Sequence, residues 1–163
     1  MSEKKITPKI EEIAADLLVE DKLKTFLEFY EFLNNNKISK VKTGINSWAI
    51  KYKDKRIGAF RFHGNLWLVS YFKSFTTEQW FEKCEKYLSV ELKDFVLNNI
   101  NPAPSGQCKK CKGVENQIIL KKAFNNVCGC EPIKLINPDG KMLEYAKELL
   151  LIGKNIVDDI AAS

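Results

Sequence analysis

Apolar and polar residues alternate with the period of an α-helix through the first part of the chain. Thr7-Pro8 places a capping residue before a proline, which is a common start of a helix. The apolar positions that follow at helical spacing are Ile10, Ile13, Ala14, Leu17 and Leu18. A second helix is predicted to begin within residues 19–21 and to end at residues 34–36, because asparagine tolerates the left-handed conformation of a helix end.

The pattern changes to a period of two within residues 44–72. One face of the first strand in this region is formed by Trp48, Ile50 and Tyr52. Tight turns are predicted at Asp54-Lys55 and at Gly64-Asn65, since these residue types adopt turn conformations easily. The region is therefore predicted to form a three-stranded antiparallel meander.

The two faces of the middle strand differ in chemistry. Phe60 and Phe62 lie on one face, and Arg61 and His63 lie on the other. The third strand, Leu66–Phe72, is apolar on both faces, so we expect it to be the most buried of the three.

The rest of the chain predicts further helices and a cysteine-bearing hairpin. Helices are expected to begin at Thr76 or Thr77, at Ser89, and after Asn137-Pro138-Asp139. Between the last two, residues 118–124 and 133–136 read as a strand and its return partner. The predicted class is α+β, in one domain over residues 1–163. Within it, residues 1–104 form helices and the meander, and residues 105–163 form the hairpin and closing helix.

Two pairs of cysteines, Cys108-x-x-Cys111 and Cys128-x-Cys130, predict a metal site. Four thiolates match the closed tetrahedral shell of structural zinc, whereas a catalytic zinc usually leaves one position open. Lysines around the first pair favour the thiolate form. An iron–sulfur or other metal centre, a disulfide or redox pair, and no ligand at all remain alternatives. Cys84 stands apart on an apolar helix face and is predicted to be a core thiol.

The net charge of +5 is concentrated in residues 37–61 and 105–130. The basic residues of the meander region are Lys40, Lys42, Lys51, Lys53, Lys55, Arg56 and Arg61. One interpretation is a nucleic-acid surface with lysines on phosphates and aromatic rings stacked on bases. The other, which the alternation favours, is a solvated basic face over buried rings. Arg56 and Arg61 are the only arginines, and this scarcity argues against sequence-specific nucleic-acid recognition.

Neither a signal peptide nor a membrane span is recognisable in the sequence. Residues 1–9 have no apolar segment behind them, and no apolar run approaches the ~20 residues that a span needs. We therefore expect a cytoplasmic protein without a membrane partner. Reducing conditions there favour thiols or metal thiolates over disulfides.

No pattern of catalytic residues is recognisable by spacing, and His63 is the only histidine. We predict a non-enzymatic binding or regulatory module for a small molecule or a protein. Its pocket would be lined by Trp48, Tyr52, Phe60, Phe62 and Trp67, together with Trp80. The alternative for these rings is an ordinary hydrophobic core. The alternative functions are a small enzyme, a metal-handling protein or a weak nucleic-acid binder.

Several features together carry a resemblance to a known group of proteins. They are the opening helices, Asn46-Ser47-Trp48, the stretch Phe124–Cys128, and Asn137-Pro138-Asp139 before the last helix. In these the chain resembles a family of small uncharacterised proteins of low-GC Gram-positive bacteria. More loosely, the order of elements is similar to YdhG-like α/β domains, which are sometimes described as iron-chaperone-like. The resemblance implies a class of fold and no particular activity.

Overall fold

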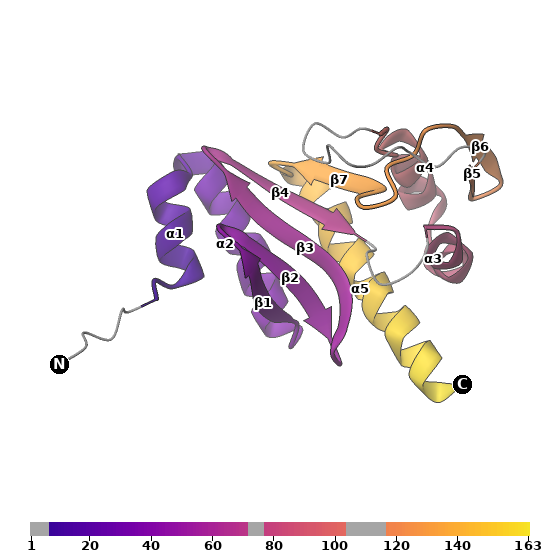
Figure 1. Ribbon diagram of the computed structural model, residues 1–163, viewed down its shortest axis with the longest axis horizontal. Helices are drawn as coiled ribbons and strands as arrows, with labels where there is room; N and C mark the ends of the chain where they lie inside the picture. Colours follow the sequence, from indigo (N-terminus) through magenta and orange to yellow (C-terminus); the bar gives the residue numbers. More distant parts are fainter. Residues whose placement is uncertain (1–6, 72–76, 104–116) are drawn as a thin grey trace.

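A five-stranded antiparallel sheet forms the centre of the structure (Figure 1). The structure is a computed structural model that describes residues 7–71, 77–103 and 117–163. The strands lie in the order β1-β2-β3-β4-β7. Their bounds are Ser39–Gly44 (β1), Ser47–Tyr52 (β2), Lys55–His63 (β3), Leu66–Tyr71 (β4) and Ile133–Ile136 (β7). With the helices described below, the sheet confirms the predicted α+β class.

The described part of the chain also contains five α-helices. They are α1 (Ile10–Leu17), α2 (Glu20–Asn35), α3 (Thr77–Cys84), α4 (Val90–Asn98) and α5 (Gly140–Ala162), with a 3-10 turn at Glu85–Tyr87 after α3. Helices α2 and α5 pack against the same face of the sheet, and α3 and α4 lie beyond its end next to α5 (Figure 1). We call the face that contacts α2 and α5 the inner face, and the opposite one the outer face.

The three predicted strands of the meander form, but the position of one turn differs and an additional strand precedes them. Gly64-Asn65 is the turn between β3 and β4, because His63 pairs with Leu66. The turn between β2 and β3 lies at Lys53-Asp54, one residue earlier than predicted, and both of its residues have the positive φ of a type I′ turn. The sequence pattern also missed β1, whose side chains are mostly exposed and lack a clear alternation.

The predicted pairing of residues 118–124 with residues 133–136 is wrong. Residues 117–124 fold on themselves as a hairpin of β5 (Gln117–Ile119) and β6 (Lys122–Phe124). Strand β7 instead pairs antiparallel with β4 and becomes the fifth strand of the main sheet. Local periodicity identifies a strand but does not identify its partner, which lies more than sixty residues away in this case.

A β-bulge in β3 decides which side chains reach the outer face. Gly58 pairs with Ile50 and Arg56 pairs with Lys51, so that Ile57 is an extra residue in β3. Ile57 and Gly58 both face α5. Simple alternation from Arg61 would place Arg56 on the inner face, and the bulge transfers it to the outer face instead.

The core lies between the inner face and the helices. Its largest fully buried side chains include Trp67, Trp80, Tyr71, Phe26, Phe29, Phe60 and Phe81. One face of α5 is buried, at positions that include Ala146, Leu149, Gly153 and Ile156. At the end of that helix Ile160 is 38% exposed. The helix therefore leaves the core in its last turn.

Candidate functional site

The loop that holds Cys128 and Cys130 is fastened to the segment that leads toward the first cysteine pair. Pro102 and Val127 form an antiparallel bridge. The Cys128 amide donates to the Asn101 carbonyl at 2.9 Å. The Ala103 amide donates to the Asn126 carbonyl at 2.7 Å. Residues 101–103 and 126–128 therefore run side by side in opposite directions.

The sulfur of Cys128 is buried and accepts a hydrogen bond. The Glu131 amide donates to Cys128 Sγ at 3.4 Å, and the Cys128 side chain is fully buried, whereas Cys130 is exposed. An amide donor stabilises a thiolate more than a thiol, as metal-bound sulfur requires. Cys108 and Cys111 lie outside the described residues. Within residues 7–71, 77–103 and 117–163, no group of three or more His, Cys, Asp or Glu could hold a metal ion.

The aromatic residues predicted to line a pocket are packed against α2. Trp48, Phe60, Phe62 and Trp67 are all at most 5% exposed. The Phe26 ring of α2 lies among them, with its centroid 5.5 Å from that of Phe60, 4.8 Å from that of Phe62 and 5.5 Å from that of Trp67. This packing is that of a core, which was the alternative interpretation of these rings.

Tyr52 differs from the other four aromatic residues. It is half-buried, and its hydroxyl donates to Asp158 of α5 at 3.4 Å. The Nζ atoms of Lys154 and Lys53 lie 4.8 Å and 5.4 Å from its ring centroid. Tyr52 therefore connects the β2–β3 turn to α5 through both its ring and its hydroxyl.

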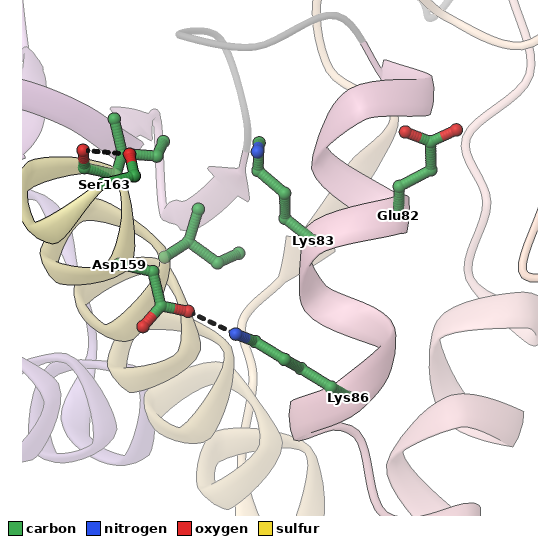
Figure 2. Close-up of a pocket in the computed structure, with 7 residues that line it drawn as sticks. Glu82, Lys83, Lys86, Asp159 and Ser163 are labelled. Atoms are coloured by element: carbon green, nitrogen blue, oxygen red, sulfur yellow. Dashed lines mark hydrogen bonds and ion pairs between the residues drawn. The ribbon is translucent and has the colours of Figure 1, made fainter.

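A cleft of about 290 Å³ lies between α3 and the end of α5 (Figure 2). Lys83 of α3 and Lys86 of the 3-10 turn that follows it point toward α5, where Lys86 Nζ contacts Asp159 Oδ2 at 2.5 Å. Tyr87 also donates a hydrogen bond to Asp159. The hydrogen bond from Lys86 lowers the pKa of Asp159 below the ordinary aspartate value. A carboxylate of low pKa is a poor general acid or base at neutral pH, so Asp159 is poorly suited to acid–base catalysis.

A second, smaller cleft of about 150 Å³ lies between α3 and the β5–β6 hairpin. Its lining residues are Phe81, Glu82, Glu85, Ile118, Leu120 and Lys121. Neither described cleft contains any of the five predicted pocket residues. Sequence patterns give little sign of clefts such as these, because each is formed by residues of elements far apart in the chain.

Cys84 and His63, the two further residues considered from the sequence, lie outside both clefts. Cys84 is fully buried, and burial raises the pKa of its thiol well above the usual range. It is therefore a core residue of low reactivity, as predicted. His63 is exposed at the end of β3, next to the Gly64 turn.

The basic residues of the meander region are divided between the two faces of the sheet, since Lys40 and Lys42 pair with Ile50 and Trp48 on the inner face. Trp48 and Phe60 are on the inner face and are buried, so they offer no ring on which a base could stack. Lys53 pairs with Asp158 on α5 at 2.6 Å. The outer face holds Lys51, Arg56 and Arg61. The part of the nucleic-acid interpretation that requires exposed aromatic rings therefore lacks support.

Comparison of the chain with family models, with curated proteins and with solved structures gives no match. The resemblance described from the sequence thus stays a prediction. None of the helices in the described part of the chain combines the length and the apolar character that crossing a membrane requires.

Proposed function

We propose that this protein is a non-enzymatic binding module of the reducing cytoplasm with a structural zinc ion in its C-terminal part. The ion would be held by Cys108, Cys111, Cys128 and Cys130, which together give the four sulfur ligands of a closed tetrahedral site. The bound ion would fasten the cysteine segment to the rest of the fold and would take no part in a reaction.

The observation that carries the proposal is the pairing of residues 101–103 with residues 126–128. Cys108 follows Ala103 by five residues, and Cys128 follows Val127 directly. Five residues span at most about 17 Å, so the chain is long enough to return to Cys128 and short enough to stay near it. The amide that donates to Cys128 Sγ adds a donor suited to a thiolate.

The chemistry of the α3–α5 cleft favours a binding role over a catalytic one. One of its two carboxylates, Asp159, is already bound by Lys86 and Tyr87, and the other is Glu82. Enzyme sites commonly raise the pKa of a carboxyl group toward neutrality, and the shift at Asp159 has the opposite direction.

Metal analysis of freshly purified, reduced protein tests the zinc site. We expect about one zinc per chain in the wild type and in Cys84→Ala, and loss of bound zinc in Cys128→Ser. Cys84→Ala is the matched control because it removes a thiol that lies outside the proposed ligand set. Absence of zinc from the wild type, or full zinc content in Cys128→Ser, would contradict the proposal.

Hydrogen exchange locates the effect of the metal. We expect removal of zinc by a chelator to speed exchange at the amides of Ala103 and Cys128, which are held by the paired segments. The amides of β3 should keep their protection because their partners lie in the main sheet. Equal loss of protection in both regions would mean that the ion supports the whole fold and not this segment.

A further inference from the structure

The outer face of the sheet has a group of cations around a floor of small side chains. Ala49 and Ala59 pair across β2 and β3 and are 1% and 7% exposed, and Ser70 of β4 pairs with Ala59 on the other side. The cations on this face are Lys51 of β2, Arg56 and Arg61 of β3, and Lys134 of β7. The bulge at Ile57 is what brings Arg56 to the same face as Arg61.

Glu131 already forms an ion pair with one of these cations, Arg61. Its carboxylate pairs with both terminal nitrogens of Arg61, with 3.2 Å between Nη2 and Oε2. Both side chains are largely buried, at 20% exposure for Arg61 and 16% for Glu131. A bidentate pair of this kind fixes the carboxylate in one orientation. Burial lowers the pKa of Arg56 and the charge of Glu131 only partly opposes this shift, so Glu131 lies near Arg56 without bonding to it.

Arg56 is left without an acceptor among the described residues. Its Nε atom is buried, and neither this atom nor Nε of Arg61 has a hydrogen-bond partner there. Burial lowers the pKa of Arg56, which shows that water only partly solvates its charge. Buried donors of this kind are rare in native proteins, and an ion or an ordered water usually satisfies them.

The charges on this face are also unbalanced. Lys51 lies directly across from Arg56 in the sheet, and like charges at paired positions repel each other. Glu131 is the one carboxylate found beside these cations in the described residues. A ligand with two negative charges would offset this excess better than a carboxylate with one. A phosphate monoester has nearly two charges at neutral pH and three acceptor oxygens.

We propose that Arg56, Lys51 and Arg61 form a binding site for a phosphate group on the outer face of the sheet. Arg56 would donate to the phosphate oxygens through its unused N–H groups, and Lys51 would add a second charge from the neighbouring strand. Arg61, held in place by Glu131, would supply its Nε–H. The site rests on the proposed function, since it names the class of ligand that the binding module would take.

Titration with inorganic phosphate, followed by NMR, tests this site. The chain has only two arginines, so their Nε–H signals are few, and the signal lost in Arg56→Lys identifies Arg56. We expect phosphate to shift the Arg56 signal and the backbone amides of Lys51 and Ala59 until saturation. Sodium chloride at equal ionic strength should not reproduce these shifts. It matches the screening of charges by phosphate buffer, so shifts seen only with phosphate report binding of phosphate itself.

Matched substitutions separate a site from a general basic surface. Arg56→Gln should weaken phosphate binding by at least about tenfold, because it removes the charge-assisted hydrogen bonds. Lys55→Gln removes the same charge at the adjacent, exposed position and should change the affinity by less than about twofold. Both variants change residues that are not fully buried, so they should fold, and their backbone amide spectra verify this.

Several results would overturn the proposal. These are the absence of saturable binding, equal weakening by the two substitutions, and acetate binding as tight as phosphate binding. A complex with a short oligonucleotide that both substitutions weaken equally would indicate a diffuse nucleic-acid surface instead. Zinc is measured on the same samples. If the protein contains one zinc per chain but does not bind phosphate, only the phosphate site is contradicted. Phosphate binding without zinc contradicts only the proposed metal.

Discussion

At the scale of single residues, Gly58 is a position where a side chain would meet both the neighbouring strand and α5. A Cβ atom at Gly58 would lie 2.8 Å from the backbone oxygen of Ser70 and 3.3 Å from Cδ2 of Leu150. The first of these atoms belongs to the neighbouring strand and cannot turn away as a side chain can. The absence of a side chain at Gly58 therefore lets the bulge lie flat against the helix.

Gly58→Ala should destabilise the protein by about 1–3 kcal/mol, since the added methyl group forces the backbone of β3 or β4 to move. Urea denaturation measures this change in the free energy of unfolding. Gly44→Ala is the matched control, because a Cβ there has only Ser47 Cβ as a neighbour, at 3.8 Å. Its effect should stay within about 0.5 kcal/mol. Equal effects of the two substitutions would show that the close contact at Gly58 is not the cause.

At the scale of elements, α4 shows how a short helix depends on the residue that caps its start. Ser89 has an extended backbone, and its Oγ accepts a hydrogen bond from the Leu92 amide at 3.1 Å. Behind this cap, Leu92 and Val96 are fully buried, so the helix has one buried face of limited size. A helix of nine residues depends on such caps and contacts because its intrinsic stability in water is small.

Ser89→Ala should cost about 1 kcal/mol of stability, because it leaves the Leu92 amide without its acceptor. Ser89→Asp should restore most of this loss, since aspartate is an equally good cap and its charge favours the start of a helix. Thermal unfolding monitored by circular dichroism compares the three proteins. If Ser89→Asp were as unstable as Ser89→Ala, the hydroxyl would have another role than capping.

At the scale of the whole molecule, α5 connects both ends of the fold by charged contacts along its length. Lys147 near its middle pairs with Glu28 of α2 at 2.5 Å. Near its end, Asp158 pairs with Lys53 of the β2–β3 turn, and Asp159 pairs with Lys86 of the 3-10 turn after α3. These contacts are mostly exposed, so each contributes little by itself, but together they orient the helix across the sheet.

The pair of Lys86 and Asp159 makes a prediction about pH. The folded pKa of Asp159 is lowered, mainly by the hydrogen bond from Lys86, so the pair stabilises the fold above the ordinary aspartate pKa of about 3.9. This contribution disappears as the pH falls through the lowered pKa of the folded state. Lys86→Gln should raise the Asp159 pKa toward its ordinary value, as measured by NMR of the carboxyl carbon.

Lys93→Gln is a suitable control for that measurement, because Lys93 pairs with Glu85 and not with Asp159. It should leave the Asp159 pKa unchanged. An unchanged pKa in Lys86→Gln itself would mean that Tyr87 or Lys83 sets the low value, since both also lower it.

Much of the fold could be predicted from the sequence, and the errors have a common origin. Helices α2 and α4 and the turn at Gly64 were predicted close to their observed places because their signals are local. Strand β1 was missed because its exposed side chains give no alternation. The partner of β7 was predicted wrongly, since pairing with β4 depends on residues distant in the chain.

In the candidate sites as well, features that are local in sequence were predictable and contacts between distant residues were not. The two cysteine pairs are visible in the sequence, and the pairing of residues 101–103 with 126–128 is not. The aromatic residues of the meander are visible in the sequence, but only the structure shows that Phe26 packs among most of them in a core. Glu131 gave no signal in the sequence, because its role depends on reaching Arg61 across the sheet.

The sequence by itself determined the class of the fold, the hydrophobic face of most elements and the number of available thiols. These properties follow from local periodicity and from composition. Only the tertiary structure decided the order of strands and the position of Arg56 on the outer face. Both depend on close packing against segments far along the chain, such as the contact between the β3 bulge and α5. Periodicity cannot encode such contacts, because it describes each residue only relative to its neighbours in sequence.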